Sequence, residues 1–108
     1  MEEKHPFVRD IFPDLVAELA ALLEDEGEHG LAVHVRDIRL VAECGCGDDF
    51  CQSLRTGHHL PERPFGEGHR CVELSPSTGM LVLDVVDERI AYIEVLGRPP
   101  MPRRGAER

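Results

Sequence analysis

The chain has 108 residues, of which 42% are hydrophobic and 31% are charged, and its formal net charge is −9. This length suits one domain with a modest core, and the hydrophobic content excludes a wholly disordered chain. The negative charge, the absence of Trp and the single Tyr disfavour nucleic-acid binding, which relies on basic and aromatic side chains. A basic protein is the macromolecular partner that this charge favours.

The N-terminus and the short apolar runs disfavour secretion and membrane insertion. Residues 1–6 lack the basic-then-apolar pattern of a signal peptide. The apolar run 19–23 is five residues long, whereas a membrane-spanning helix needs about 20. We therefore expect a cytoplasmic protein with no membrane partner. Thiols stay reduced in that compartment, which favours metal ligation or free cysteines over disulfides.

The first regular element that we expect is a helix, after a polar tail over residues 1–9. Pro13 suits the first helical position, and Asp14 complements the positive charge of a helix N-terminus. Gly27 and Gly30 are expected to end the helix. Its apolar residues recur with helical spacing and predict one buried stripe, made of Phe12, Leu15, Val16, Leu19, Leu22 and Leu23.

The same helical region is the most acidic part of the chain. Residues 10–28 contain seven acidic side chains and no basic one. A surface of this kind suits a basic protein partner, through contacts that would weaken with salt.

The rest of the chain is predicted to form short strands, after a short helix or turn over residues 31–37 whose apolar spacing also fits a strand. A hairpin is expected from 38–44 and 51–55, with the glycine-rich segment 44–51 as its turn. Residues 56–70 contain three glycines and two prolines and predict a loop. Three further strands are expected at 71–74, 80–86 and 90–96.

The last two strands are largely apolar on both faces, which places them centrally in the sheet and under the helix. The final strand could instead lie at an edge, where pairing with a second copy would give a homodimer. Residues 98–108 contain three prolines and predict a disordered C-terminal tail. The expected fold is α+β, one domain over residues 10–97 with an N-terminal helix packed on an antiparallel sheet of about five strands.

The most distinctive feature of the chain is a group of cysteines. Cys44, Cys46 and Cys51 lie within eight residues and are separated by glycines, and Cys71 is the fourth cysteine. Thiolates and imidazoles bind zinc, and a closed structural zinc site needs four ligands. We therefore predict a zinc site with these four cysteines as ligands, and with His69 as the alternative fourth ligand.

Position distinguishes the two candidates for the fourth ligand, because zinc accepts both chemistries. Cys71 begins a predicted strand, which would hold it rigidly, whereas His69 follows Gly68 in the predicted loop. His58 and His59 are candidates after these. The alternatives to a metal site are free thiols packed as small hydrophobic side chains, or a redox disulfide.

Three stretches, 40–51, 66–70 and 79–90, resemble a group of small bacterial proteins with a C-x-C-G-x-x-x-C turn. The resemblance covers about residues 13–97 and implies no assigned activity. No catalytic residue is predicted, because Asp48 and Asp49 would raise the pKa of neighbouring thiols and so oppose a nucleophilic cysteine.

Three functions remain open on the sequence. The first is a non-enzymatic, zinc-stabilised domain in protein interaction or regulation. The second is a metal-free acidic module that binds or inhibits a basic protein. The third is a thiol-based redox sensor or enzyme.

Overall fold

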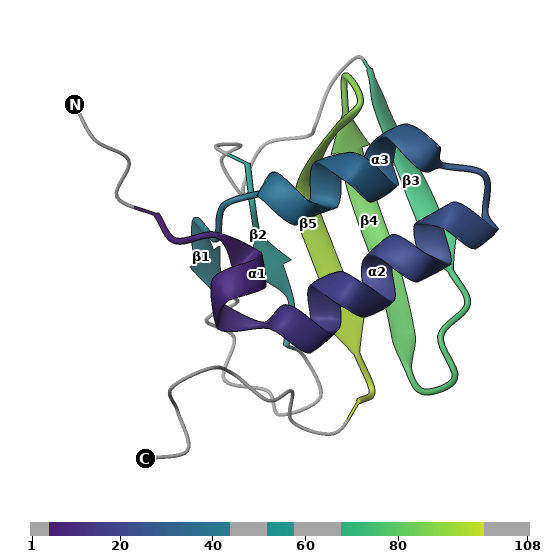
Figure 1. Cartoon of the computed structure of the whole chain (residues 1–108), viewed down its shortest axis with the longest axis horizontal. Coiled ribbons are helices and arrows are strands. Elements are labelled where there is room, and N and C mark those ends of the chain that lie inside the picture. Colours follow the sequence, from purple (N-terminus) through teal and green to yellow (C-terminus); the bar gives the residue numbers. More distant parts are fainter. Residues whose placement is uncertain (1–4, 44–51, 58–67, 99–108) are drawn as a thin grey trace.

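The computed structural model describes residues 5–43, 52–57 and 68–98. Within them the fold is α+β, as predicted, with helices on one side of an antiparallel five-stranded sheet (Figure 1). The helical elements are α1 (Val8–Ile11), α2 (Pro13–Asp25), α3 (His29–His34) and the 3₁₀ turn η1 (Val35–Asp37). The strands are β1 (Ala42–Glu43), β2 (Leu54–Arg55), β3 (His69–Leu74), β4 (Met80–Val86) and β5 (Arg89–Leu96).

Helix α2 begins at Pro13, as the sequence predicts, and the expected stripe is buried except for Leu22, which is partly buried. It ends before Gly27, whose φ of 79° is a left-handed conformation that favours glycine. Gly30 was also expected to end this helix, but it lies inside α3. The turn at Gly27 is sufficient to reverse the chain, so Gly30 belongs to the next helix. The short helix or turn expected over 31–37 is confirmed as α3 and η1.

The N-terminal tail is shorter than the predicted residues 1–9. Val8 is fully buried in α1, and its backbone N–H donates to the carbonyl of Ile38. Phe7 forms a β-bridge with Arg39, whose guanidinium lies 3.8 Å from the centre of the Phe7 ring. These contacts with a distant segment hold the backbone of residues 7 and 8 in place. No local periodicity in the sequence predicts such contacts.

The strands follow the order β1-β2-β5-β4-β3, and every neighbouring pair is antiparallel. Consecutive strands β3, β4 and β5 with β2 beside β5 form a Greek-key arrangement. Strand β4 has the predicted bounds, while β3 and β5 begin one or two residues earlier than expected. Within the described residues the strand expected at 38–44 is reduced to β1, because the backbone of residues 39 and 40 bonds the N-terminal segment instead.

Strand β5 lies inside the sheet, so the alternative in which it forms an edge is wrong. Leu54 pairs with Ile93 and Arg55 pairs with Tyr92, which places β2 along the side of β5 that a second copy would need. The edge strands of the described sheet are β1 and β3. A homodimer stays a prediction, but its route through β5 is removed.

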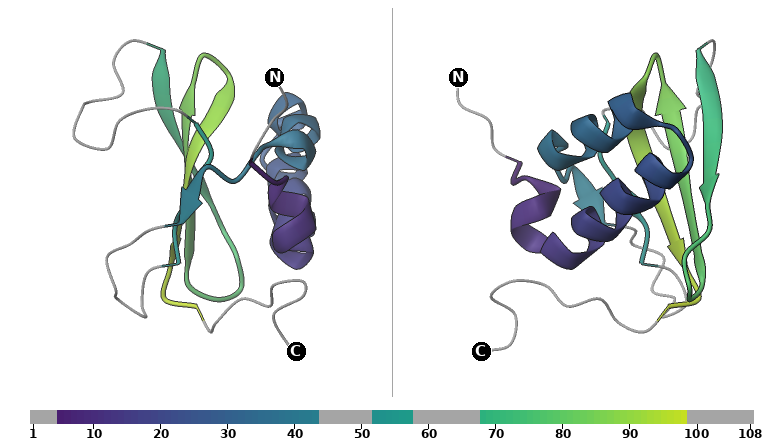
Figure 2. Two further views of the ribbon diagram at one scale, coloured as in Figure 1. Left: turned by 90° about the vertical axis from the view of Figure 1, so that its left-hand side faces the viewer. Right: turned by 45° about the vertical axis from the view of Figure 1, so that its right-hand side comes forward.

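The helices cover one face of the sheet (Figure 2). Alternation along the strands sends Leu81, Leu83 and Ile93 into the core beneath them, where all three are fully buried. We call the other face the outer face; its described residues include His69, Cys71, Glu73, Val82, Asp84, Tyr92 and Glu94.

The C-terminal tail expected over 98–108 begins later than residue 98, because Arg98 pairs with Glu18 of α2 and is largely buried. Residues 99–108 lie outside the described part.

No helix in the described segments has the length and apolar character that a bilayer crossing requires.

Candidate metal site

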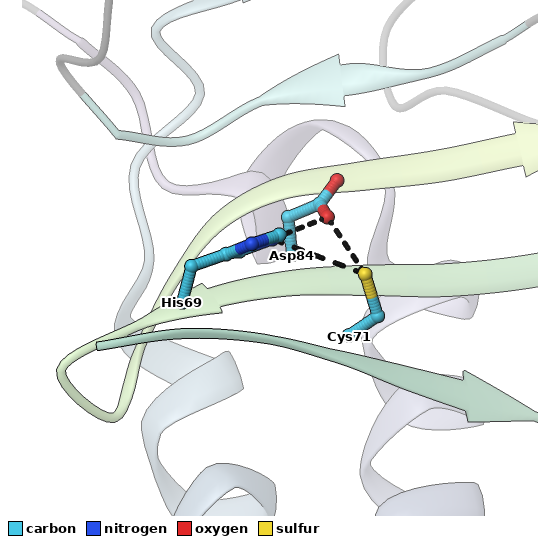
Figure 3. Close-up of side chains that lie close together, drawn as sticks. All are labelled: His69, Cys71 and Asp84. Atoms are coloured by element: carbon cyan, nitrogen blue, oxygen red, sulfur yellow. Dashed lines mark hydrogen bonds and ion pairs between the residues drawn. The ribbon is translucent and has the colours of Figure 1, made fainter. Parts of the chain in front are cut away.

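Three potential metal ligands of different chemistry lie together on the outer face (Figure 3). His69 and Cys71 are two residues apart on β3, so the alternation of a strand sends both side chains to the same face. Asp84 lies on β4 directly opposite Cys71 in the antiparallel register. Strand periodicity and register alone therefore place the three side chains side by side.

The distances within this group suit a single small cation. His69 Nε2 lies 2.9 Å from Asp84 Oδ1, Cys71 Sγ lies 3.3 Å from the same oxygen, and the sulfur lies 3.9 Å from Nε2. Zinc with bond lengths of about 2.0–2.3 Å separates its tetrahedral ligand atoms by about 3.3–3.8 Å. Shifts of a few tenths of an ångström would convert these hydrogen-bond distances into a coordination face.

The electrostatics of the group favour a cation. The pKa of the Cys71 thiol is raised above 9.0, first because its S–H donates to Asp84, and then through burial and the negative charges of Asp84, Glu94 and Glu73. Burial, the charge of Asp84 and a hydrogen bond with it raise the pKa of Glu94. The raised pKa values of Cys71 and Glu94 mark a region of negative potential, which a bound metal ion would relieve.

The same geometry disfavours a nucleophilic cysteine. A reactive thiol needs a lowered pKa, whereas that of Cys71 is raised. In a Cys–His–Asp relay the thiol and the carboxylate contact opposite ring nitrogens of the histidine. At this site both face Nε2 of His69. The arrangement fits three metal ligands better than a catalytic triad.

A set of nitrogen, sulfur and oxygen ligands would suit zinc better than magnesium or calcium, which prefer oxygen alone. Three protein ligands would leave one tetrahedral position for water or an additional ligand. Asp84 is nearly buried, with a side chain that is 7% exposed, while that of His69 is 28% exposed. The Asp84 side of the group is therefore shielded from solvent, and the His69 side is accessible.

Two of the predicted site residues, Cys71 and His69, lie together in the structure, although the prediction gave them as alternative fourth ligands. Cys44, Cys46 and Cys51 lie outside the described residues, as do His58 and His59. The sequence analysis missed Asp84. The sequence did contain an indication of its role, because Asp84 is the only charged residue in the strand Met80–Val86. A buried acid in an apolar strand requires a partner.

The acidic region over residues 10–28 is partly neutralised within the fold. Its ion pairs join Glu18 to Arg98, Glu28 to Arg70, and Glu24 to His29. Arg70 contacts both oxygens of Glu28, at 2.9 and 3.0 Å, which ties the segment between α2 and α3 to β3. Two of these acids, Glu18 and Glu28, therefore connect the helical layer to β3 and to the residue two positions after β5.

Comparison with known proteins gives no match: no family model matches this sequence. No curated protein matches it. No solved structure matches it either.

Proposed function

We propose that the protein is a small non-enzymatic zinc-binding domain in which His69, Cys71 and Asp84 are ligands of one Zn²⁺ ion. The observation that carries this proposal is the close approach of an imidazole nitrogen, a sulfur and a carboxylate oxygen on the outer face. The ion would neutralise the crowded carboxylates and join the edge strand β3 to its neighbour β4. We place the role of such a domain in protein interaction or regulation.

Zinc content after purification under reducing conditions tests the proposal. We expect about one zinc per chain, because each ligand can bind when its proton is lost. Cys71→Ser, His69→Gln and Asp84→Asn should each lower zinc affinity at least about 100-fold, a larger effect than the loss of a surrounding hydrogen bond. His29→Gln is the matched control, since His29 is exposed, contacts Glu24 and lies in α3 on the opposite side of the sheet (Figure 2).

A second comparison separates this ligand set from the predicted four-cysteine site, which shares Cys71. The triple variant Cys44→Ser, Cys46→Ser, Cys51→Ser should retain its zinc if the outer-face group binds it. Cobalt substitution reports the number of thiolates through the intensity of the sulfur-to-cobalt band, and we expect one. Loss of metal in the triple variant together with retention in Asp84→Asn would reject the outer-face site.

The acidic surface supports a second candidate function, a binding module for a basic protein. Among the described acids, Asp14, Asp25 and Glu26 are exposed on or beside α2. A complex formed there should weaken strongly with salt and with Asp25→Asn, Glu26→Gln, while zinc binding stays unchanged. A complex that is indifferent to ionic strength would contradict this function.

A further inference from the structure

A cavity of about 520 Å³ lies away from the metal ligands, where the residues flanking η1, the chain directly after β2 and the turn between β4 and β5 meet. Cavities of this size accommodate small organic molecules. Its wall combines guanidinium groups, an imidazole ring and apolar groups. The residues that contribute them include Arg39, Arg89, His34, Ile38, Ile90 and Gly57. None of His69, Cys71 and Asp84 lines it.

Two arginines in the wall give the cavity a positive character in a chain of net charge −9. Arg9, Arg70 and Arg98 form ion pairs with carboxylates. Within the described residues, neither Arg39 nor Arg89 has such a partner. Arg39 stacks on the Phe7 ring and donates to the carbonyl of His5, at 2.9 Å, so its guanidinium is fixed in place without being neutralised.

His34 is a further polar residue in the wall of the cavity. Its Nε2 is buried and has no hydrogen-bond partner in the described structure, whereas buried polar atoms nearly always have one. Burial and the positive charge of Arg89 lower the pKa of His34, despite the opposing charge of Asp37. The imidazole is therefore neutral at pH 7, and Arg89 is close enough to affect it.

Much of the remaining wall is apolar. Ile38, Val86 and Ile90 contribute aliphatic surface, and Gly57 lies against β5. A Cβ at residue 57 would come within 3.1 Å of the Cα and the Cβ of Ala91, so glycine permits this close approach. One acid, Asp87, lines the cavity as well, which offsets one of the two arginine charges and favours a ligand with a single negative charge.

We infer that this cavity binds a small organic monoanion, with a carboxylate held by Arg39 and Arg89 and an apolar body packed on the aliphatic wall. The guanidinium geometry matches a carboxylate. This inference is independent of zinc, because the cavity and the metal group share no residue.

Benzoate is a suitable probe, titrated into the full isotope-labelled chain while backbone amide signals are recorded. We expect saturable shifts at Gly57, Arg89 and Ala91, with a Kd on the order of 1 mM for so small a molecule. Benzamide has the same shape without the charge, so its Kd should be at least about fivefold higher than that of benzoate. Asp84→Asn should bind benzoate as the unmodified chain does, which separates this site from the zinc proposal.

Arg89→Gln is the decisive variant, since Arg89 is exposed and its replacement leaves the core intact. It should weaken benzoate binding about fivefold. Arg36→Gln is the matched control, because Arg36 is an exposed arginine in η1 outside the cavity wall. Absence of saturable shifts, equal affinity for benzoate and benzamide, or equal effects of the two variants would each overturn the inference.

Discussion

The two faces of the sheet differ sharply although the same strands form them. On the covered face, Leu83 and Ile93 are fully buried under the helices. On the outer face, Cys71, Asp84 and Glu94 gather sulfur and carboxylate groups whose charges interact. Because side chains alternate along a strand, β3 and β4 contribute to the core through one set of residues and to the candidate site through the other.

The difference indicates that the two sets can be changed separately. A substitution on the covered face should alter the free energy of unfolding and leave ligand binding by the folded protein intact. A substitution on the outer face should change metal binding and have a much smaller effect on the free energy of unfolding. The predictions that follow test this separation, beginning with the largest expected effect.

Leu83→Ala should lower the free energy of unfolding by about 3 kcal/mol, because it removes buried aliphatic volume and leaves a cavity. Urea denaturation followed by circular dichroism measures this loss. Met80→Ala on the same strand is the control, since Met80 is 52% exposed and should change stability by less than about 0.5 kcal/mol. Equal losses in the two variants would contradict the assignment of faces.

Zinc affinity should rise about tenfold per pH unit between about pH 7 and 9, because the metal must displace the thiol proton of Cys71. The raised pKa of this thiol means that the proton is still bound at neutral pH. Competition with a chelator at several pH values measures the slope. In Cys71→Ser the slope should become much shallower; an unchanged slope would exclude Cys71 as a ligand.

Glu28→Gln should destabilise the fold by about 1 kcal/mol, because it removes one charge of a partly exposed bidentate ion pair. Arg70 lowers the pKa of Glu28 below 4.5. The pair is therefore fully stabilising above pH 4.5, and its contribution is lost as the pH falls through the lowered pKa. The variant should show a smaller loss of stability in acid, measured by thermal unfolding.

Glu26→Gln is the control for that measurement, because Glu26 is an exposed acid two residues away. It should leave both the stability at pH 7 and the acid dependence nearly unchanged. If Glu26→Gln and Glu28→Gln behave alike, the ion pair with Arg70 does not contribute to stability in solution.

Glu94→Gln should stabilise the metal-free protein at pH 7 by about 0.5 kcal/mol, as it removes a charge held near Asp84. The raised pKa of Glu94 means that its protonated form favours folding below pH 4.5. That contribution is lost as the pH rises through the raised pKa, the opposite sense to Glu28. Chemical denaturation at pH 5 and pH 7 checks the sign, and a destabilised variant at pH 7 would contradict it.

Local sequence patterns were sufficient for the regular elements with clear boundaries. Pro13 and the glycine at position 27 delimit α2, and turn residues flank the strand Met80–Val86. The central position of β5 was also predicted, from the apolar residues on both of its faces, and the strand order confirms it. The ordered structure around Val8 and the pairing of β5 with β2 were not predictable in the same way, because both depend on hydrogen bonds with segments distant in the chain.

The residues of the candidate site also differ in how far local patterns predict them. His69 and Cys71 share a face because they are two residues apart, which the sequence states directly. Asp84 joins them only through the register between β3 and β4, which no local pattern specifies. The sequence did contain one indication, a single charge in an otherwise apolar strand, whose partner could be found only from the fold.

The Greek-key order has a consequence for the sequence of folding events. Strands β3, β4 and β5 are neighbours in the chain, and the turn at Asp87 and Glu88 has positive φ at both residues, as in the tightest hairpins. Closing β2 onto β5 instead encloses a long loop, which costs more entropy. The hairpins should therefore form early, so that changes in the Asp87–Glu88 turn slow refolding, whereas Leu54→Ala mainly accelerates unfolding in stopped-flow experiments.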